Sequence, residues 1–277
     1  MNSSKLKEKA AAFGAMHHGP KILLLANVWD AASAVIVRHA GFGALATSSA
    51  GIAFSLGYPD GQRISREEML AVVARITKCA DIPVTADVEA GYGDRPEDAA
   101  ETTRGVLEAG AVGMNLEDAT NDAENPLEDL QLQVEKIRAV REVAASAGVP
   151  VVLNARTDAY LLEVGESGKR YDLALKRLIA FRDAGADCLF VPGVIDAETI
   201  QRFVRDLKFP LNILAGPGSP SVAELEKMGI ARISLGSGVM RATLGYLQRI
   251  VAEAKTAGTY KTLEGAPTFA EMNRMLS

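Results

Sequence analysis

Short apolar runs alternate along the chain with longer stretches in which apolar residues recur every three or four positions. The short runs predict buried strands, and the longer stretches predict amphipathic helices. The alternation repeats eight times between residues 22 and 256. The predicted strands are residues 22–26, 44–47, 82–86, 112–116, 151–155, 187–191, 211–214 and 232–235, and the predicted helices are residues 30–40, 65–79, 96–109, 128–147, 170–184, 196–207, 221–228 and 239–256.

The pattern within these units predicts a closed barrel. Strands such as VVLNA at 151–155 are almost entirely apolar, which indicates burial on both faces in a parallel sheet. Glycine recurs at the helix-to-strand joints, as in EAGAVGM and DAGADCL, where a helix ends in a left-handed cap. Eight such units favour a (β/α)8 TIM barrel over an open doubly wound sheet, and no G-x-G-x-x-G opens the first helix.

We expect one domain over residues 1–277, with the barrel at about residues 20–256 and a C-terminal helical extension at 257–277. Thr268 and Glu271 have the spacing of a helix capping box in this extension. Asp30 is expected to cap the first barrel helix. The stretch GPGSPSVAE resembles a phosphate-binding loop, but Ser221 and Glu224 have capping-box spacing, so a plain helix start is favoured.

Composition narrows the class of partner. The net charge is −5 and lysine and arginine are scattered, so no basic surface for nucleic acid is indicated. No apolar run reaches the roughly 18 residues of a membrane span, and the N-terminus lacks the apolar core of a signal peptide. We expect a cytoplasmic protein that binds a small molecule, with no nucleic-acid or membrane partner.

Histidine and cysteine chemistry is not expected. The three histidines are His17 and His18 near the N-terminus and His39 in a helix, which argues against a histidine base or a multi-histidine metal site. Cys79 and Cys188 lie far apart without C-x-x-C spacing, so they are interpreted as buried free thiols.

Acidic residues instead gather where the chemistry of a (β/α)8 enzyme is found, at the C-terminal ends of the strands. Asp87 and Glu89 follow the third predicted strand two positions apart, so we expect them to share one strand face. Adjacent strands add Asn115, Glu117 and Asp118, and then Asn154, Arg156 and Asp158.

Like charges this close require a compensating cation. Oxygen ligands without histidine or thiolate favour Mg²⁺, with Mn²⁺ also possible. The alternative is that Glu117 or Asp118 caps the next helix or pairs with a surface arginine, and for Asp118 the two interpretations are equally open. Gly91 and Gly93 have a simpler interpretation as turn glycines that lead the chain from strand to helix.

These motifs resemble those of the phosphoenolpyruvate mutase/isocitrate lyase superfamily over roughly residues 27–247. The resemblance is carried by DVEAGYG from Asp87, NLED from Asn115 and NAR from Asn154, together with SSAG from Ser48 and LGYPD ending at Asp60. It implies that Asp87 is the direct Mg²⁺ ligand, that Glu89 and Glu117 hold the metal through water, and that Asp60 reaches the water shell or the reacting group.

The resemblance also implies the substrate contacts. Ser48, Ser49 and Ala50 would offer hydroxyl and backbone N–H groups to a substrate carboxylate, and Asn115 would contact the substrate as well. Arg156 would pair with the developing charge. The superfamily is typically tetrameric with the eighth helix exchanged between subunits, so a homotetramer is expected.

The sequence departs from the familiar branches of the superfamily in three places. Glu89 stands where the family usually has Asp. The loop at 119–126, ATNDAENP, lacks the Lys-Lys/Arg-Cys-Gly-His motif of the isocitrate and methylisocitrate lyases. Only Thr120 and Asn121 remain of the mutase Lys-Thr-Asn, and Pro192-Gly193 replaces the mutase histidine. The same loop is a candidate lid over the metal.

Three functions follow from these expectations. The favoured one is a Mg²⁺-dependent lyase or decarboxylase that acts on a small 2-oxo or 2-hydroxy dicarboxylate, such as oxaloacetate or methylisocitrate, through a metal-bound pyruvate-type enolate. The first alternative is a mutase or hydrolase acting on the P–C bond of phosphonopyruvate or carboxyphosphonoenolpyruvate. The second alternative is a non-catalytic barrel that binds a metabolite.

Overall fold

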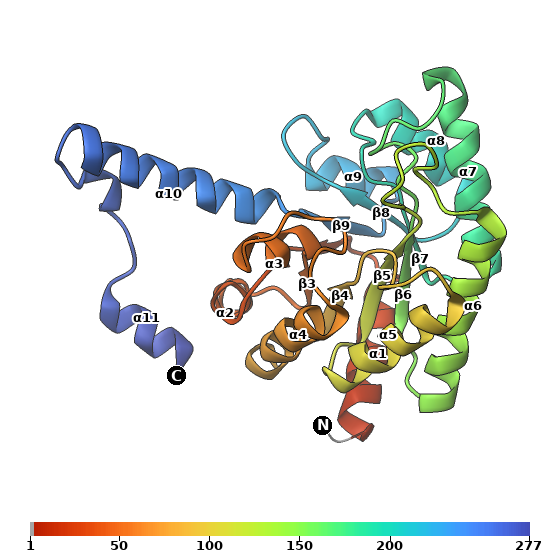
Figure 1. Ribbon diagram of the computed structural model, residues 1–277, viewed down its shortest axis with the longest axis horizontal. Helices are drawn as coiled ribbons and strands as arrows, with labels where there is room; N and C mark the ends of the chain where they lie inside the picture. The colour runs from red at the N-terminus through yellow and green to blue at the C-terminus, as the bar shows by residue number, and fades with distance from the viewer. Residues whose placement is uncertain (1–2) are drawn as a thin grey trace.

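The computed structural model describes residues 3–277, and its described part contains one sheet of nine parallel strands that closes into a nearly complete barrel (Figure 1). The strands are β1 Leu23–Leu25, β2 Asn27–Val28, β3 Leu45–Thr47, β4 Val84–Asp87, β5 Gly113–Glu117, β6 Val152–Arg156, β7 Cys188–Phe190, β8 Leu211–Leu214 and β9 Arg232–Ser234. The fold is therefore of the TIM-barrel type, as the alternation of strands and helices predicts.

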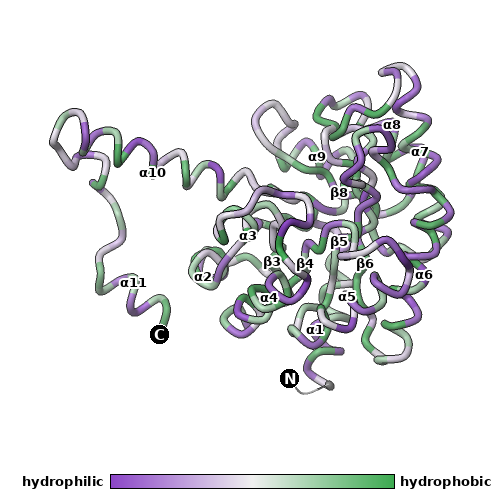
Figure 2. The backbone as a smooth tube through the Cα atoms, viewed as in Figure 1, coloured by the Kyte–Doolittle hydropathy of each residue, from purple (hydrophilic) through white to green (hydrophobic). Residues whose placement is uncertain are grey.

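Helices follow the strands around the outside of the barrel, and all eight predicted helices are present. The helices are α1 Ser3–Met16, α2 Ala31–His39, α3 Ser49–Ser55, α4 Arg66–Ala80, α5 Pro96–Glu108, α6 Leu130–Ala147, α7 Ser167–Asp183, α8 Ala197–Leu207, α9 Val222–Met228, α10 Gly238–Thr256 and α11 Phe269–Leu276, with a short 3-10 helix at Lys261–Leu263. The helix tubes alternate between hydrophobic and hydrophilic positions (Figure 2), as expected for helices that cover a barrel on one face only.

The ninth strand arises because two short strands flank Ala26, where a single strand over 22–26 was predicted. The first, β1, pairs with β9, and the second, β2, which lies beyond the predicted strand, pairs with β3, so this segment joins the two ends of the sheet. The side chain of Asn27 connects the ends of β3 and β9. It donates to the backbone oxygen of Thr47 at 2.8 Å and accepts from the N–H groups of Leu235 and Gly236, each at 2.8 Å.

Helix α1 is a feature that the hydrophobic pattern did not predict. It covers the N-terminal end of the barrel, and its Phe13 is fully buried there. A Cβ placed on Gly113 of β5 would lie only 2.8 Å from the Phe13 ring, so the absence of a side chain at position 113 leaves space for this ring. The prediction failed because the helix is rich in alanine and lysine and shows little apolar periodicity.

The predicted helix caps are confirmed. Asp30 accepts from the N–H of Ser33 at the start of α2, and capping boxes link Ser221 to Glu224 and Thr268 to Glu271. The phosphate-loop alternative for GPGSPSVAE therefore has no support from the hydrogen bonding. Both cysteines are free thiols, with Cys188 buried and Cys79 half-buried.

Helix α10 projects away from the barrel and ends in the arm that carries α11 (Figure 1). Met240 is its one buried residue, although the helix has apolar residues along its length. Within the described residues, no helix is long and apolar enough to cross a membrane.

Candidate active site

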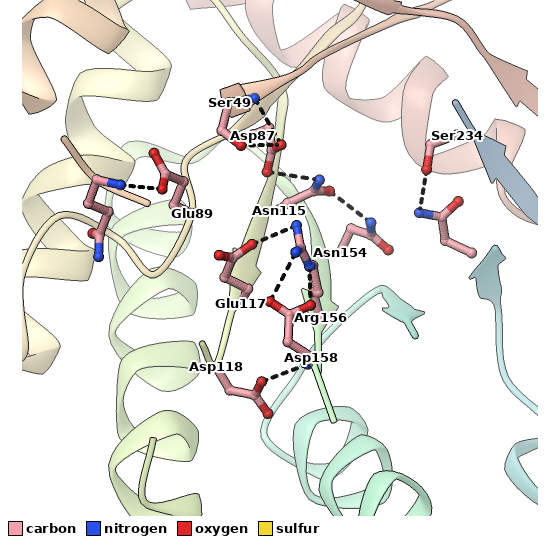
Figure 3. Close-up of polar contacts among 12 residues, drawn as sticks. Ser49, Asp87, Glu89, Asn115, Glu117, Asp118, Asn154, Arg156, Asp158 and Ser234 are labelled. Carbon is pink, nitrogen blue, oxygen red and sulfur yellow. Dashed lines mark hydrogen bonds and ion pairs between the residues drawn. The ribbon is translucent and has the colours of Figure 1, made fainter. Parts of the chain in front are cut away.

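Four of the predicted site residues, Asp87, Asn115, Glu117 and Arg156, meet with Asn154 at the C-terminal ends of β4, β5 and β6 (Figure 3). Strand register brings them together, because Asp87 lies opposite Asn115, Asn115 opposite Asn154, and Glu117 opposite Arg156. The strand residues between them point outward into the helix layer, as alternation requires. All five side chains are largely buried, with Arg156 the most accessible.

Asp87 is held by three hydrogen-bond donors. Ser49 donates to Oδ2 of Asp87 from both its backbone N–H, at 3.0 Å, and its hydroxyl, at 2.9 Å. Asn115 donates its side-chain N–H to Oδ1 at 3.2 Å. A carboxylate can accept more bonds than these, so Asp87 keeps the capacity to bind one cation.

Arg156 is fixed between two carboxylates. Its Nε and Nη2 donate to the two oxygens of Asp158 at 2.6 and 2.9 Å, and its Nη1 lies 2.6 Å from Oε2 of Glu117. The guanidinium lies over the Phe190 ring at 5.7 Å. Each terminal nitrogen retains one N–H, so the rigid group can still bind a substrate oxygen.

Glu89 does not share a strand face with Asp87, which corrects the expectation drawn from strand alternation. The strand ends at Asp87, and Glu89 lies in the following turn with a φ of +53°. Its Oε2 accepts from the backbone N–H of Gln62 at 2.5 Å, and its Oε1 accepts from the Tyr92 hydroxyl at 3.3 Å. The turn therefore directs Glu89 toward the loop that carries Asp60 instead of along the barrel wall.

The carboxylates nevertheless lie close enough to raise one another's pKa values. Burial, followed by the neighbouring Asp60 and Asp87, raises the pKa of Glu89 to about 7. Burial and then Asp87 also raise the pKa of Asp60, although part of that residue is exposed on its loop. Burial raises the pKa of Glu117 well above its usual value, and the charge of Arg156 opposes this only in part. The site therefore places more carboxyl groups close together than the guanidinium of Arg156 alone can balance in their ionised form.

The other predicted residues lie close to this cluster in different roles. The Ser48 hydroxyl accepts from the N–H of Gly51 and so caps α3, while Ala50 is buried in the first turn of that helix. Asp118 pairs with the buried Arg177 at 2.5 Å and accepts from the N–H of Asp158 at 2.9 Å. Of the two interpretations left open for Asp118, the contacts favour the structural one, and the arginine is buried instead of lying at the surface.

Three contributors received no role from the sequence: Gln62, Asn154 and Asp158. Asp158 follows Arg156 by two positions, so the spacing could have suggested the pair. Gln62 lies in a loop remote in sequence from Glu89, and nothing local pointed to it. The functional assignments of the site residues remain proposals.

The donor set fits a hard divalent cation held mainly by one carboxylate. Within residues 3–277, no three His, Cys, Asp or Glu side chains lie close enough together to bind one metal ion directly. Asp87 as the single direct ligand, with Glu89 and Glu117 acting through water, stays a prediction. Oxygen donors and excess negative charge suit Mg²⁺ or Mn²⁺.

A barrel of this kind, with carboxylates and one arginine at the C-terminal ends of its strands, has the form of a TIM-barrel enzyme. The family model of phosphoenolpyruvate phosphomutase matches residues 13–255, and the chain belongs to this family, within the phosphoenolpyruvate mutase/isocitrate lyase superfamily. The superfamily members named among its relatives are enzymes, mainly lyases.

Individual relatives agree with this membership. A solved structure of a proposed lyase/mutase from Burkholderia cenocepacia is 39% identical and superposes with a TM-score of 0.92, covering 98% of this chain and 96% of that one. The 2-methylisocitrate lyase of Bacillus subtilis is 28% identical over 93% of this chain and 85% of its own length. The oxaloacetate decarboxylase of Pseudomonas paraeruginosa is 30% identical over 83% of this chain and 79% of its own.

Proposed function

We propose that the protein is a Mg²⁺-dependent lyase or decarboxylase that cleaves a C–C bond of a small 2-oxo or 2-hydroxy dicarboxylate and leaves a pyruvate-type enolate. The observation that carries the proposal is the placement of carboxylates around one rigid guanidinium at the barrel mouth. The electrostatically coupled acids are Asp60, Asp87, Glu89, Glu117 and Asp158.

Each residue has a defined task in this proposal. Asp87, held by Ser49 and Asn115, would bind the metal directly, and Glu89 and Glu117 would hold its water molecules. A divalent cation supplies Lewis-acid stabilisation of negative charge on the substrate oxygens. The free N–H groups of Arg156 would donate hydrogen bonds to the same substrate oxygens, and the two hydrogen bonds to Asp158 hold the guanidinium in place for this role.

Decarboxylation of an oxaloacetate-like acid fits these residues best. When the bond to the departing carboxylate breaks, its electron pair moves into the enolate and CO₂ leaves without receiving a proton. No acid is then required on the leaving group, and the loop at 119–126 contains no Lys, Cys or His. The similarity to an oxaloacetate decarboxylase supports this choice.

Metal and inhibitor binding test the proposal first. Mg²⁺ and then oxalate, a mimic of the pyruvate enolate, are titrated calorimetrically into the wild type and into Asp87→Asn. We expect the wild type to bind both and the variant to bind neither measurably. A wild type that binds neither would favour the non-catalytic alternative.

Product analysis then separates the two classes of chemistry. The protein with Mg²⁺ is incubated with oxaloacetate, 2-methylisocitrate and phosphonopyruvate, and followed by proton and phosphorus NMR. Pyruvate formation without a change in the phosphorus spectrum supports C–C cleavage. New phosphate or phosphoenolpyruvate signals would instead establish the P–C alternative.

We also propose that the chain assembles as a homotetramer with α10 exchanged between subunits. The helix extends from the barrel with its apolar side chains exposed, including Leu244 at 37%, Leu247 at 51% and Val251 at 55%. Phe269 of α11 is 85% exposed. Apolar surface arranged along a projecting helix is typical of a face that a second subunit covers.

A further inference from the structure

A network of polar side chains lies inside the barrel, directly beneath Asp87. Asn154 of β6 and Arg232 of β9 are both fully buried, and Asn115 of β5 is 6% exposed. Figure 3 shows Asp87, Asn115 and Asn154 in one line across neighbouring strands, each joined to the next by a hydrogen bond. The metal role proposed above for Asp87 does not by itself account for Asn154 or Arg232.

We propose that Asn154 and Arg232 are positioning residues, which hold the amide of Asn115 so that it orients the carboxylate of Asp87 for metal binding. The proposal rests on the metal site of the proposed function. It concerns residues that make no contact with that metal or with a substrate.

Hydrogen-bond complementarity fixes the direction of the amide. The carbonyl oxygen of Asn115 accepts from Nδ2 of Asn154 at 2.8 Å and from Nη2 of Arg232 at 3.4 Å. Arg232 can only donate and the Asp87 carboxylate can only accept, so the oxygen of Asn115 must face Arg232 and its NH₂ group must face Asp87, where it donates at 3.2 Å. A flipped Asn115 amide would place oxygen against the carboxylate and NH₂ against the guanidinium, and both contacts would be repulsive. Asn154 matches the orientation that these two charged groups impose by donating its own NH₂ to the Asn115 oxygen.

The same orientation limits how Asp87 can turn. Ser49 holds Oδ2 from the α3 side and Asn115 holds Oδ1 from the β5 side, so the carboxylate plane is fixed at both oxygens. A metal ligand held in this way loses little conformational freedom when it binds the metal. Residues that hydrogen-bond to a metal ligand and orient it typically contribute about 10–100-fold to metal affinity.

This polar network is not expected to stabilise the fold, because several of its buried atoms have no hydrogen-bond partner. Within the described chain, Nε and Nη1 of Arg232 and Oδ1 of Asn154 have no hydrogen-bond partner although they are buried. Buried polar groups in this condition are costly, and apolar side chains of similar size are often neutral or stabilising in their place. Burial lowers the pKa of Arg232 only to about 10, so its charge persists at neutral pH and attracts the carboxylate of Asp87.

A double-mutant cycle on metal affinity tests the proposal. Mn²⁺ binding is measured by electron paramagnetic resonance for the wild type, Asn154→Leu, Asn115→Ala and the double variant. We expect each single variant to bind Mn²⁺ about 10–100-fold more weakly. The double variant should be no weaker than Asn115→Ala alone, because Asn154 acts through Asn115. Additive losses would overturn the inference.

Arg232→Met is a second test variant, and we expect it to lose Mn²⁺ affinity by the same factor as Asn154→Leu. Phe203→Leu is the control for a general loss of stability, because Phe203 is fully buried in α8 and packs on Tyr160 and Tyr171. Thermal midpoints are compared for all variants. If Phe203→Leu weakens Mn²⁺ binding as much as Asn154→Leu at equal destabilisation, the positioning role is refuted.

A metal-free readout separates this inference from the proposed function. The side-chain amide signal of Asn115 in the ¹⁵N spectrum is identified by its loss in Asn115→Ala. It should move in Asn154→Leu without added metal, and an unchanged signal would overturn the inference even if the wild type binds Mn²⁺. A wild type that binds no Mn²⁺ would overturn the proposed metal site, and the positioning role with it.

Discussion

Two adjacent serines offer a sharp test of how the site is organised, because the structure gives them different partners. Ser49 donates both its N–H and its hydroxyl to Asp87, whereas the Ser48 hydroxyl accepts from the N–H of Gly51 at the start of α3. The family resemblance assigns both serines to the substrate carboxylate. The contacts instead make Ser49 a support for the proposed metal ligand, and alanine at each position distinguishes the two.

The expected magnitude follows from the bond that is lost. Ser49→Ala removes one buried hydrogen bond to a charged acceptor, at 2.9 Å, and keeps the backbone donor at 3.0 Å. Hydrogen bonds to charged groups contribute about 1.5–3 kcal/mol. We expect the free energy of unfolding to fall by that amount and Mn²⁺ affinity to fall about tenfold or more, even without substrate.

Ser48→Ala is the matched control. It removes an N-cap hydrogen bond, which typically costs about 1 kcal/mol, and it leaves every contact to Asp87 in place. Its Mn²⁺ affinity should equal that of the wild type.

Thermal unfolding and Mn²⁺ titration, each with and without oxalate, measure both variants. If Ser49→Ala binds Mn²⁺ as the wild type does but loses affinity for oxalate, the serine serves the substrate and our reasoning is refuted.

Three further predictions concern other parts of the molecule. Burial, and then the nearby Arg232, lowers the pKa of His17 to about 4, so the unfolded chain gains a proton between about pH 6.5 and pH 4 that the folded chain does not. The free energy of unfolding should fall by up to about 3 kcal/mol as the pH drops through that window, and denaturation of His17→Phe should lack this component; an identical slope would contradict the assignment. Deleting residues 121–125, next to Gly61 on the neighbouring loop, should reduce turnover far more than Mg²⁺ affinity, and equal losses would argue against a lid. Leu247→Asp on the apolar face of α10 should reduce the oligomer measured by light scattering, whereas Ala242→Asp, exposed on the opposite side of the helix, should not. A mass that is unchanged in both variants would exclude a role for this face.

Much of the fold could be predicted because the spacing of apolar residues along the chain distinguishes strands from helices. All eight predicted strands and helices are present, and the residues at their ends define where a barrel enzyme places its site. Helix α1 was missed because its buried face consists, among the described side chains, only of Leu6, Ala10 and Phe13, and further alanines on its exposed side weaken the periodic pattern. Helix α3 was missed because seven residues are too few to show a period.

The sequence by itself determined the barrel, the caps, and the convergence of Asp87, Glu117 and Arg156 on one end, because strand alternation and strand order follow from spacing. Only the tertiary structure decided what each group contacts. A positive φ turns Glu89 away from the strand face, Ser49 faces Asp87 across strands, and Asp118 finds Arg177 from a distant helix. These contacts join segments far apart in the chain, so no local pattern carries them, and the packing of the barrel determines which acids lie close together.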